Sequence, residues 1–341
     1  MARVLVIATS HKTKGGISAI LNMLSEQELW TKYNCTWIAS TIDTNLLVKV
    51  FTMILGLIRY IVLLPKSDIV YLHVSSPLSS KRKYIYFRLA ELLHKKTIIH
   101  LHYGNQINKC WNRYYEYMFT HSDVNFVLSD ITKSDILRLM NGKADITVLH
   151  NPCIAVENDF SLRTKQILFA GTVVRDKGIY DLLTAFKSVS ERHHDWTLFV
   201  AGAGETDKCK EMAHELGISD KVVFAGWISG KEKDMAFRKS SIFCLPSYAE
   251  GFPMAILDAW AYGLPVVTTP VGGRPNLAEN NENSILVNLG DHENLCKEIC
   301  GLIENENKWK YISRNAYNIS HGELSVNYYS HILDDTFSSI L

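Results

Sequence analysis

Residues 241–273, SIFCLPSYAEGFPMAILDAWAYGLPVVTTPVGG, decide the expected fold of this chain. Their first apolar run predicts a buried strand, and a polar turn that contains Glu250 follows it. Pro253 is expected to be the first residue of a helix, because a fixed φ and a missing N–H are tolerated there. Gly263 is expected to end that helix, and a second apolar run follows. The order strand, loop, helix, strand is typical of a parallel sheet covered by helices.

Two acids in this stretch indicate a ligand site. The expected helix at 253–262 is apolar on nearly every side, so it should be buried, yet it carries Asp258. An unpaired acid on such a helix is costly, so Asp258 should contact either a protein group or a ligand. Glu250 lies in the loop at the carboxyl end of a strand. This edge is where open parallel sheets bind ligands.

The same stretch resembles the signature of the family 4 retaining glycosyltransferases, two-domain enzymes of the GT-B fold that belong to glycosyl transferases group 1. The family pattern is an acid, Gly-Phe-Pro, four residues, a second acid, and later Gly-x-Pro-Val-Val. The residues that match it in order are Glu250, Gly251, Phe252, Pro253, Asp258, Gly263, Pro265, Val266 and Val267. Asp258 is a departure, because the family usually has Glu there and Asp is one methylene shorter.

Short apolar runs alternate with helical patterns along the whole chain, which predicts an α/β fold. The runs predicted as strands are 4–9, 69–73, 97–101, 124–128 and 146–149, followed by 166–170, 197–201, 222–225, 241–245, 265–269 and 284–287. The 341 residues suffice for two domains. The resemblance implies GT-B architecture, with two Rossmann-like domains facing across a cleft. The expected parts are an acceptor-binding domain at 1–155, a nucleotide-sugar-binding domain at 156–322, and a helix at 323–341 packing back on the first domain.

Charge is distributed unevenly along the chain. Residues 1–150 hold 18 basic and 10 acidic residues, a balance of +8, which leaves −7 for the remainder of a chain with net charge +1. A basic half can face nucleic acid, an anionic membrane or an anionic substrate. No nucleic-acid motif is present, so no nucleic-acid partner is expected. The scattered cysteines and the absence of a secretory pattern at the N-terminus indicate a cytoplasmic protein.

Residues 46–64, LLVKVFTMILGLIRYIVLL, form a long apolar run that Lys49, Gly56 and Arg59 interrupt. These interruptions argue against a helix that spans a membrane. Two interpretations remain open: a helix packed against the sheet, or an apolar face that rests on a membrane surface. Exposed basic residues nearby would add attraction to anionic lipids, and the candidates are Lys81, Arg82, Lys83, Lys95 and Lys96.

Two candidates for donor binding lie in the first half. Gly15 and Gly16 stand between a strand and a helix, where a backbone can approach a phosphate, although by themselves they favour a plain turn. The resemblance implies that Gly16 lies near the donor diphosphate. His100 and His102 alternate on a strand and so share one face. No third metal ligand at suitable spacing is evident, and the resemblance places His102 close to the transferred sugar, with His100 structural.

The second half opens with a candidate anion site after the strand at 166–170. Arg175 and Lys177 lie in a loop before a helix, which suits stabilisation of a diphosphate. The family pattern is Gly-Arg, a few residues, then Lys-Gly. Lys177 matches it, but Thr172 occupies the usual Arg position. Arg175 therefore either reaches the diphosphate from a different backbone position or belongs to the surface.

Trp227 and Ile228 match the family segment around the nucleotide base. The resemblance implies that Trp227 packs beside the base and that Ile228 bonds it through backbone groups, while a core position for Trp227 is the alternative. The Gly-x-Gly at 202–204 lacks the third glycine of a dinucleotide fingerprint, since Asp207 stands there, so a turn is the better interpretation. No Asp-x-Asp triplet occurs, so neither a metal nor another cofactor is expected.

The resemblance implies a retaining, hexosyltransferase-type enzyme that uses a nucleotide-sugar, most often UDP-linked in this family, and the missing Asp-x-Asp predicts that it is metal-independent. The resemblance implies that Glu250 holds sugar hydroxyls beside the backbone of Gly251, Phe252 and Pro253, and that Asp258 holds the ribose. Family habit points to a glycan or lipid-linked acceptor in bacterial O-antigen, capsule or lipopolysaccharide synthesis, with peripheral contact at the inner face of the plasma membrane. A GT-B-type UDP-sugar epimerase and a non-catalytic sugar- or lipid-binding subunit remain as alternatives.

Overall fold

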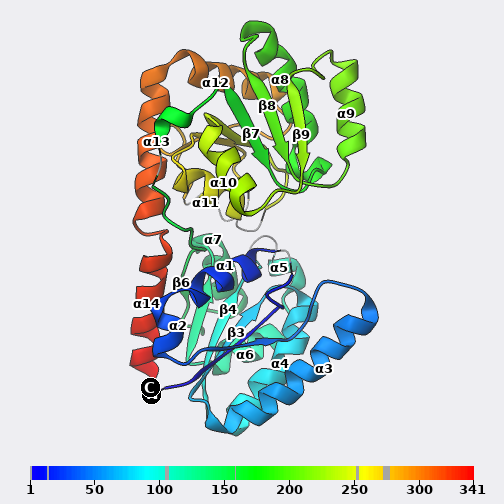
Figure 1. The fold of residues 1–341 in the computed structure, drawn as a ribbon. Coiled ribbons are helices and arrows are strands. Elements are labelled where there is room, and N and C mark those ends of the chain that lie inside the picture. The colour runs from blue at the N-terminus through cyan, green and yellow to red at the C-terminus, as the bar shows by residue number, and fades with distance from the viewer. Residues whose placement is uncertain (1, 14, 104–106, 158, 251–252, 272–276) are drawn as a thin grey trace. The chain divides into compact units, whose positions relative to one another are not determined.

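The computed structural model describes residues 2–13, 15–103, 107–157, 159–250, 253–271 and 277–341. The chain divides into two compact units, one of Met1–Pro152 with Val326–Leu341 and one of Cys153–Ser325. Each unit is a parallel sheet covered by helices (Figure 1). The expected class, α/β with two Rossmann-like units, is therefore confirmed.

The first unit holds a six-stranded sheet in the order β2-β1-β3-β4-β5-β6. Its strands are β1 Val4–Ala8, β2 Thr36–Ala39, β3 Ile69–Val74, β4 Lys96–Leu101, β5 Val124–Val127 and β6 Thr147–Val148. Its helices are α1 Gly16–Ser25, α2 Glu28–Lys32, α3 Leu46–Leu63, α4 Pro77–Leu92, α5 Ile107–Cys110, α6 Arg113–His121, α7 Asp130–Leu139 and α14 Val326–Ile340, with a 3₁₀ turn at Leu64–Lys66. The strand order reverses between β1 and β3, which makes this a doubly wound sheet.

The second unit repeats the arrangement in the order β12-β11-β10-β7-β8-β9. Its strands are β7 Gln166–Ala170, β8 Thr197–Ala201, β9 Val222–Gly226, β10 Ile242–Leu245, β11 Val266–Thr268 and β12 Ser284–Leu286. Its helices are α8 Ile179–Arg192, α9 Thr206–Glu215, α10 Gly230–Lys239, α11 Met254–Ala261, α12 His292–Glu304 and α13 Glu306–His321, with 3₁₀ turns at Phe160–Leu162 and Arg175–Lys177. The order reverses between β7 and β10, so ligands are expected outside the carboxyl ends of these two strands.

The continuous apolar runs of the sequence form the central strands. Helices cover both faces of a parallel sheet, so successive side chains of a central strand are buried on either face. Every residue of β1, β3 and β10 is buried. β2 was not among the predicted strands. Only Ile38 of this strand is buried and the other three residues are half-buried, so its sequence lacks the apolar pattern that predicts a strand. Its pairing with β1 is what holds it in the sheet.

The last helix, α14, packs within the first unit. Asp334 on α14 accepts hydrogen bonds from Lys32 at 2.6 Å and from the Tyr33 hydroxyl at 2.6 Å. Phe337 is buried against the Tyr33 ring. The chain therefore returns to its first unit after Ser325, and the division falls at Pro152 and Cys153.

Two local expectations need correction. Pro253 has an extended backbone, with φ −74° and ψ 108°, so it caps α11 and the helix begins at Met254. Lys83 is buried, and its ammonium donates to the Ile7 carbonyl at 2.8 Å and to Ser40 Oγ at 2.6 Å. Lys83 is therefore an internal bridge between strands, and it does not contribute to a basic surface.

Candidate functional site

The loops that follow β7 and β10 are tied together through their backbones. Gly178 has φ +73°, and a Cβ built on it would lie 2.1 Å from the Pro246 carbonyl oxygen. The Tyr248 N–H donates to the Asp176 carbonyl at 2.8 Å. Only glycine tolerates both this conformation and this close approach. The Lys-Gly pair of the first loop is thus what allows it to lie against the second loop.

This contact brings together Lys177 and Glu250, the two residues that the sequence placed at the centre of the site. Lys177 Nζ lies 2.7 Å from Glu250 Oε1, and Ser247 Oγ donates to the same oxygen at 2.8 Å. The Glu250 side chain is only 7% exposed and that of Lys177 is 26% exposed. A charge-assisted hydrogen bond of this kind holds both groups in place. The pair lies at the point where the strand order reverses, as expected for a ligand site in such a sheet.

Arg175 lies in the same loop as Lys177 but points to different partners. Its guanidinium lies over the Tyr180 ring, 5.1 Å from the centroid. The Tyr180 hydroxyl donates to Glu205 at 3.1 Å, and Lys208 pairs with the same carboxylate at 2.7 Å. Arg175 and Thr172 are both exposed. The structure therefore gives Arg175 a stacking partner on α8 at the edge of the site, and Thr172 offers no charge there.

Asp258 has a protein partner that the sequence did not reveal. Its Oδ2 lies 2.6 Å from Lys233 Nζ on α10, and the Asp258 side chain is 27% exposed. Helix α11 is buried as predicted, through Ile256, Leu257, Ala259, Trp260 and Ala261. Asp258 is thus on the margin of the buried helix, where an ion pair satisfies it. Lys233 is one of several charged residues on α10, so nothing in the sequence singles it out.

Trp227 follows β9 and its side chain is 56% exposed, so the interpretation as a core residue was wrong. Ile228 is half-buried and packs against the core of the second unit. Gly202 and Gly204 serve loop packing, because Cβ atoms there would lie 1.7 Å from the Gly171 carbonyl oxygen and 2.3 Å from that of Val173. The loops after β7 and β8 therefore lie against one another at one edge of the sheet.

The remaining predicted residues are distributed as follows. Gly16 opens α1 directly after the loop that follows β1. Pro253 caps α11, three residues beyond Glu250. Gly251 and Phe252 lie outside the described residues.

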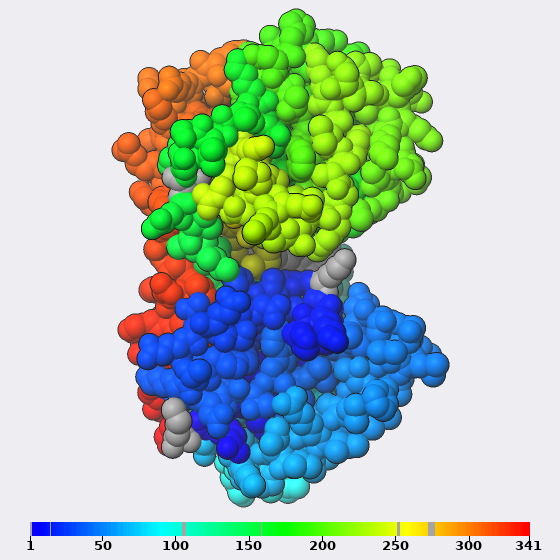
Figure 2. All heavy atoms as spheres, in the orientation of Figure 1, coloured from blue at the N-terminus to red at the C-terminus, as the bar shows by residue number. Residues whose placement is uncertain are grey.

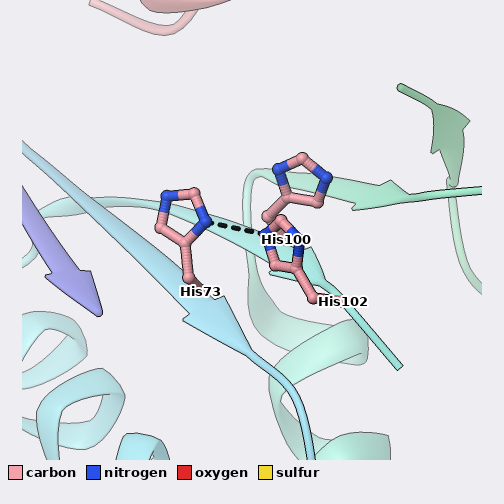
Figure 3. A group of neighbouring side chains, drawn as sticks. All are labelled: His73, His100 and His102. Atoms are coloured by element: carbon pink, nitrogen blue, oxygen red, sulfur yellow. Dashed lines mark hydrogen bonds between the residues drawn. The ribbon is translucent and has the colours of Figure 1, made fainter. Parts of the chain in front are cut away.

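His102 belongs to a cluster of three histidines at the carboxyl ends of β3 and β4 in the first unit (Figure 3). A hydrogen bond of 2.8 Å joins His73 Nδ1 and His102 Nε2, and the tautomers decide which of the two rings donates. His100 Nδ1 lies 2.7 Å from the Tyr71 hydroxyl. Burial, followed by the charge of Lys83, lowers the pKa of His102 to about 3. Burial also lowers the pKa values of His73 and His100 well below their usual range. All three imidazoles are therefore neutral at pH 7.

The ring nitrogens of this cluster could supply three metal ligands, since they all lie within 4.8 Å of one another. The sequence did not reveal His73 as the third member, because it is on the neighbouring strand, in register with His100 and far from it along the chain. The residues that the structure describes contain one other such group, His193, Cys300 and Glu304. Neither group includes Lys177 or Glu250.

Comparison with known proteins identifies the second unit. Residues 154–319 match the family described as "Glycosyl transferases group 1". An uncharacterized glycosyltransferase of Methanocaldococcus jannaschii is 27% identical over 220 residues, covering 59% of this chain and 56% of that protein. A lipopolysaccharide 1,6-galactosyltransferase of Salmonella typhimurium is 25% identical over 202 residues, covering 56% and 55%. The chain thus spans about half the length of these curated relatives.

Solved structures extend the likeness to the whole fold. The structure of Anabaena HepE in complex with UDP superposes with a TM-score of 0.77 at 17% identity, covering 99% of this chain and 100% of that one. At this identity the likeness concerns the fold alone. Residues 154–319 of the second unit are thus similar to the glycosyl transferases group 1, and the two Rossmann-like units have the GT-B fold.

Proposed function

We propose that this protein is a retaining, metal-independent glycosyltransferase of family 4, of the hexosyltransferase type. It transfers a sugar from a UDP-linked nucleotide-sugar to a glycan or glycolipid acceptor. The observation that carries the proposal is the Lys177–Glu250 pair, held at 2.7 Å where the strand order reverses. The match of residues 154–319 to glycosyl transferases group 1 supports the reaction class, and the UDP bound to HepE supports the donor class.

The two members of the pair have complementary tasks. A lysine ammonium has three N–H donors, and the bond to Glu250 occupies one of them, so the others can neutralise the leaving diphosphate. A carboxylate accepts about four hydrogen bonds, so the two on Oε1 leave capacity for sugar hydroxyls. Positive charge placed where negative charge develops lowers the barrier to glycosidic cleavage. The acceptor then attacks from the same face, and the leaving phosphate takes its proton.

Other residues complete the donor site in this proposal. The exposed Trp227 packs beside the base and the backbone of Ile228 bonds it. Asp258 accepts hydrogen bonds from the ribose hydroxyls, and its ion pair with Lys233 holds the carboxylate in place. Sequence correspondence adds Gly251 and Phe252 to the sugar end of the site, with Pro253, and adds Gly16 and Arg175 to the diphosphate.

His102 contributes a neutral hydrogen-bonding group. Its pKa of about 3 keeps the imidazole uncharged, so it bonds sugar hydroxyls and does not act as a cationic acid. The hydrogen bond with His73 fixes the orientation of the ring.

The proposed acceptor is a lipid-linked unit of a bacterial surface polysaccharide, such as O-antigen, capsule or lipopolysaccharide. The name of the Salmonella typhimurium relative, a lipopolysaccharide 1,6-galactosyltransferase, supports this class. The basic balance of residues 1–150 suits an anionic acceptor. Such an acceptor places the protein at the cytoplasmic face of the membrane, as a peripheral protein.

The first experiment identifies the donor and tests the pair. A panel of UDP-, GDP- and ADP-sugars is screened by thermal shift, because a ligand that binds the native state raises its melting temperature. Transfer is then measured for the wild type, Glu250→Gln and Lys177→Gln, with Glu306→Gln and Lys310→Gln as exposed controls from another ion pair. We expect Glu250→Gln and Lys177→Gln to lower kcat by about 10²- to 10³-fold. The controls should retain wild-type kcat.

The outcomes separate the alternatives. Near-wild-type transfer by both site variants contradicts the proposed site. Loss of transfer in EDTA, restored by a divalent cation, contradicts metal independence, and an inverted anomeric configuration in the product contradicts retention. Conversion of a UDP-sugar to its epimer without an acceptor identifies an epimerase. Donor binding without any hydrolysis or transfer identifies a non-catalytic subunit.

A further inference from the structure

Helix α3 is attached to the first unit by a narrow strip of its surface. The structure describes all of α3, and its buried residues are Gly56 and Tyr60. A Cβ on Gly56 would lie 2.1 Å from the Ala39 carbonyl oxygen, so the helix backbone lies directly on the end of β2. The Tyr60 hydroxyl donates to the Tyr86 carbonyl on α4 at 2.7 Å. Figure 1 shows α3 beside α4, at the edge of the first unit.

The opposite side of α3 is exposed and apolar. Its exposed large apolar side chains are Leu46, Leu47, Val48, Val50, Phe51, Ile54, Leu55, Ile58, Ile61 and Val62, with exposed fractions from 43% to 83%. At about 100° per residue these positions fill a continuous arc of about 200°. Lys49 and Arg59 fall outside this arc. The blue spheres of this helix form part of the outer surface in Figure 2.

This orientation reverses the usual pattern of a surface helix, in which the polar face meets water. A contiguous apolar patch of this kind marks a contact with a protein partner or with lipid. The segment Leu46–Lys66 is long and apolar enough to cross a membrane. A helix that crosses a bilayer cannot stay packed on a sheet, however, and Gly56 and Tyr60 hold α3 against β2 and α4. A helix that lies along a surface agrees with these contacts.

The surroundings of the apolar arc are basic. A pocket of about 410 Å³ at the end of α3 is lined by Arg3, Asn34, Thr36, Arg59, Val62 and Leu63. Two guanidiniums beside apolar side chains suit a phosphate that carries acyl chains. The adjacent helix α4 exposes Leu78, Lys81, Ile85, Arg88 and Leu92, spaced three and four residues apart along one side. Between Asp43 and Glu91 the sequence holds one acid, Asp68.

We propose that α3 lies in the surface of an anionic phospholipid bilayer, with its apolar arc among the acyl chains. The pocket beside Arg3 and Arg59 takes a lipid phosphate, and the basic side of α4 faces neighbouring headgroups. The inference deepens the peripheral membrane contact of the proposed function by naming its surface and its lipid chemistry. Apolar burial and attraction to anionic lipid act together in such helices.

The test is flotation of the full chain with vesicles, without nucleotide-sugar. The vesicles are either pure phosphatidylcholine, which is neutral, or phosphatidylcholine with about 30% phosphatidylglycerol, which is anionic. The variant that tests the apolar arc is the double substitution Leu47→Gln/Phe51→Gln. Its control is Val223→Gln/Leu289→Gln, at two exposed apolar positions in the second unit. The variant that tests the basic pocket is Arg3→Gln/Arg59→Gln. Its control is Lys143→Gln/Lys187→Gln, at two exposed basic positions.

We expect the wild type and both controls to float with anionic vesicles about tenfold or more tightly than with neutral ones. The apolar variant should lose binding to both, and the arginine variant should lose the preference for anionic vesicles. Donor thermal shifts are measured on the same proteins, so failure of membrane binding is distinguished from failure of the donor site. Circular dichroism and melting temperature verify folding.

Four results would overturn the proposal. The first is that the wild type does not float with vesicles, and the second is that the apolar variant floats as well as the wild type. The third is that alkaline carbonate does not release the bound protein. The fourth is that the wild type sediments as a dimer and binds no vesicles, while the apolar variant sediments as a monomer. Carbonate resistance would assign a spanning helix. The dimer result would assign the apolar arc to a second copy of this chain.

Discussion

Helices α3 and α11 are both almost wholly apolar in sequence, yet the fold treats them in opposite ways. Helix α11 buries Trp260 and four of its other apolar residues and brings its acid, Asp258, to a lysine. Helix α3 buries Gly56 and Tyr60 and exposes its apolar side chains. An apolar helix is unfavourable in water whatever its position in the fold. The comparison shows that the neighbouring elements decide whether the protein itself buries such a helix.

The largest expected effect breaks this comparison directly. Trp260→Ala should lower the free energy of unfolding of the second unit by about 3–5 kcal/mol, because it leaves a cavity and removes the bond to Ser284 Oγ. Phe51→Ala on α3 should change it by less than about 0.5 kcal/mol, since Phe51 is 61% exposed. Urea unfolding of both variants measures the contrast. A loss above about 2 kcal/mol for Phe51→Ala would mean that the protein covers α3.

A second pair of substitutions sharpens how α3 is held. Gly56→Ala should destabilise the first unit by about 1–3 kcal/mol, because its Cβ would meet the Ala39 carbonyl oxygen at 2.1 Å. Gly301→Ala is the matched control within α12, where a Cβ has no neighbour within 4 Å. There alanine should stabilise by up to about 1 kcal/mol through helix propensity. Thermal and urea unfolding report both signs. Equal effects at the two sites would contradict the close approach at Gly56.

The third contrast lies within the first unit, which exposes the apolar side chains of α3 but buries the polar imidazoles beside β3 and β4. The folded pKa of His102 is about 3, below the usual value near 6.5, so the folded state binds fewer protons than the unfolded chain between these values. Stability is therefore present above about pH 6.5 and falls as the pH drops toward 3, by up to about 1.4 kcal/mol per pH unit for this group.

Urea unfolding between pH 7 and pH 4.5 measures this slope. His102→Asn should reduce it, while His331→Asn, at an exposed position on α14, should leave it unchanged. A slope that does not change in the His102 variant would show that this imidazole takes up its proton at the same pH in the folded and the unfolded protein.

The smallest expected effect concerns the acid of α11. Asp258→Asn removes the pair with Lys233, whose partners are 27% and 41% exposed, so the loss of stability should stay below about 1 kcal/mol. Donor affinity should fall more than stability, if Asp258 holds the ribose. Calorimetry with the identified donor measures the affinity, and Asp258→Glu tests whether the longer side chain restores it. An unchanged affinity in Asp258→Asn would remove Asp258 from the proposed site.

The strand and loop pattern of the second unit could be predicted because each signal is local. The run before Glu250, the glycine after the helix and the Lys-Gly pair each constrain their own backbone, and all predicted strands lie within a few residues of those observed. The start of α11 was one residue wrong, since Pro253 tolerates the cap position as readily as the first turn. Strand β2 was missed because its burial comes from pairing with β1.

By itself the sequence determined the α/β class, the order of strands and helices, and the loop positions of Lys177 and Glu250. Tertiary structure alone decided that these two side chains meet at 2.7 Å, because a backbone contact between Gly178 and Pro246 joins distant loops. It also decided the partners Lys233 and His73, which come from neighbouring elements. For α3 the sequence left two positions open, because an almost uniformly apolar helix has no polar face to orient it. The strip at Gly56 and Tyr60 provides that orientation, and it turns the apolar arc outward.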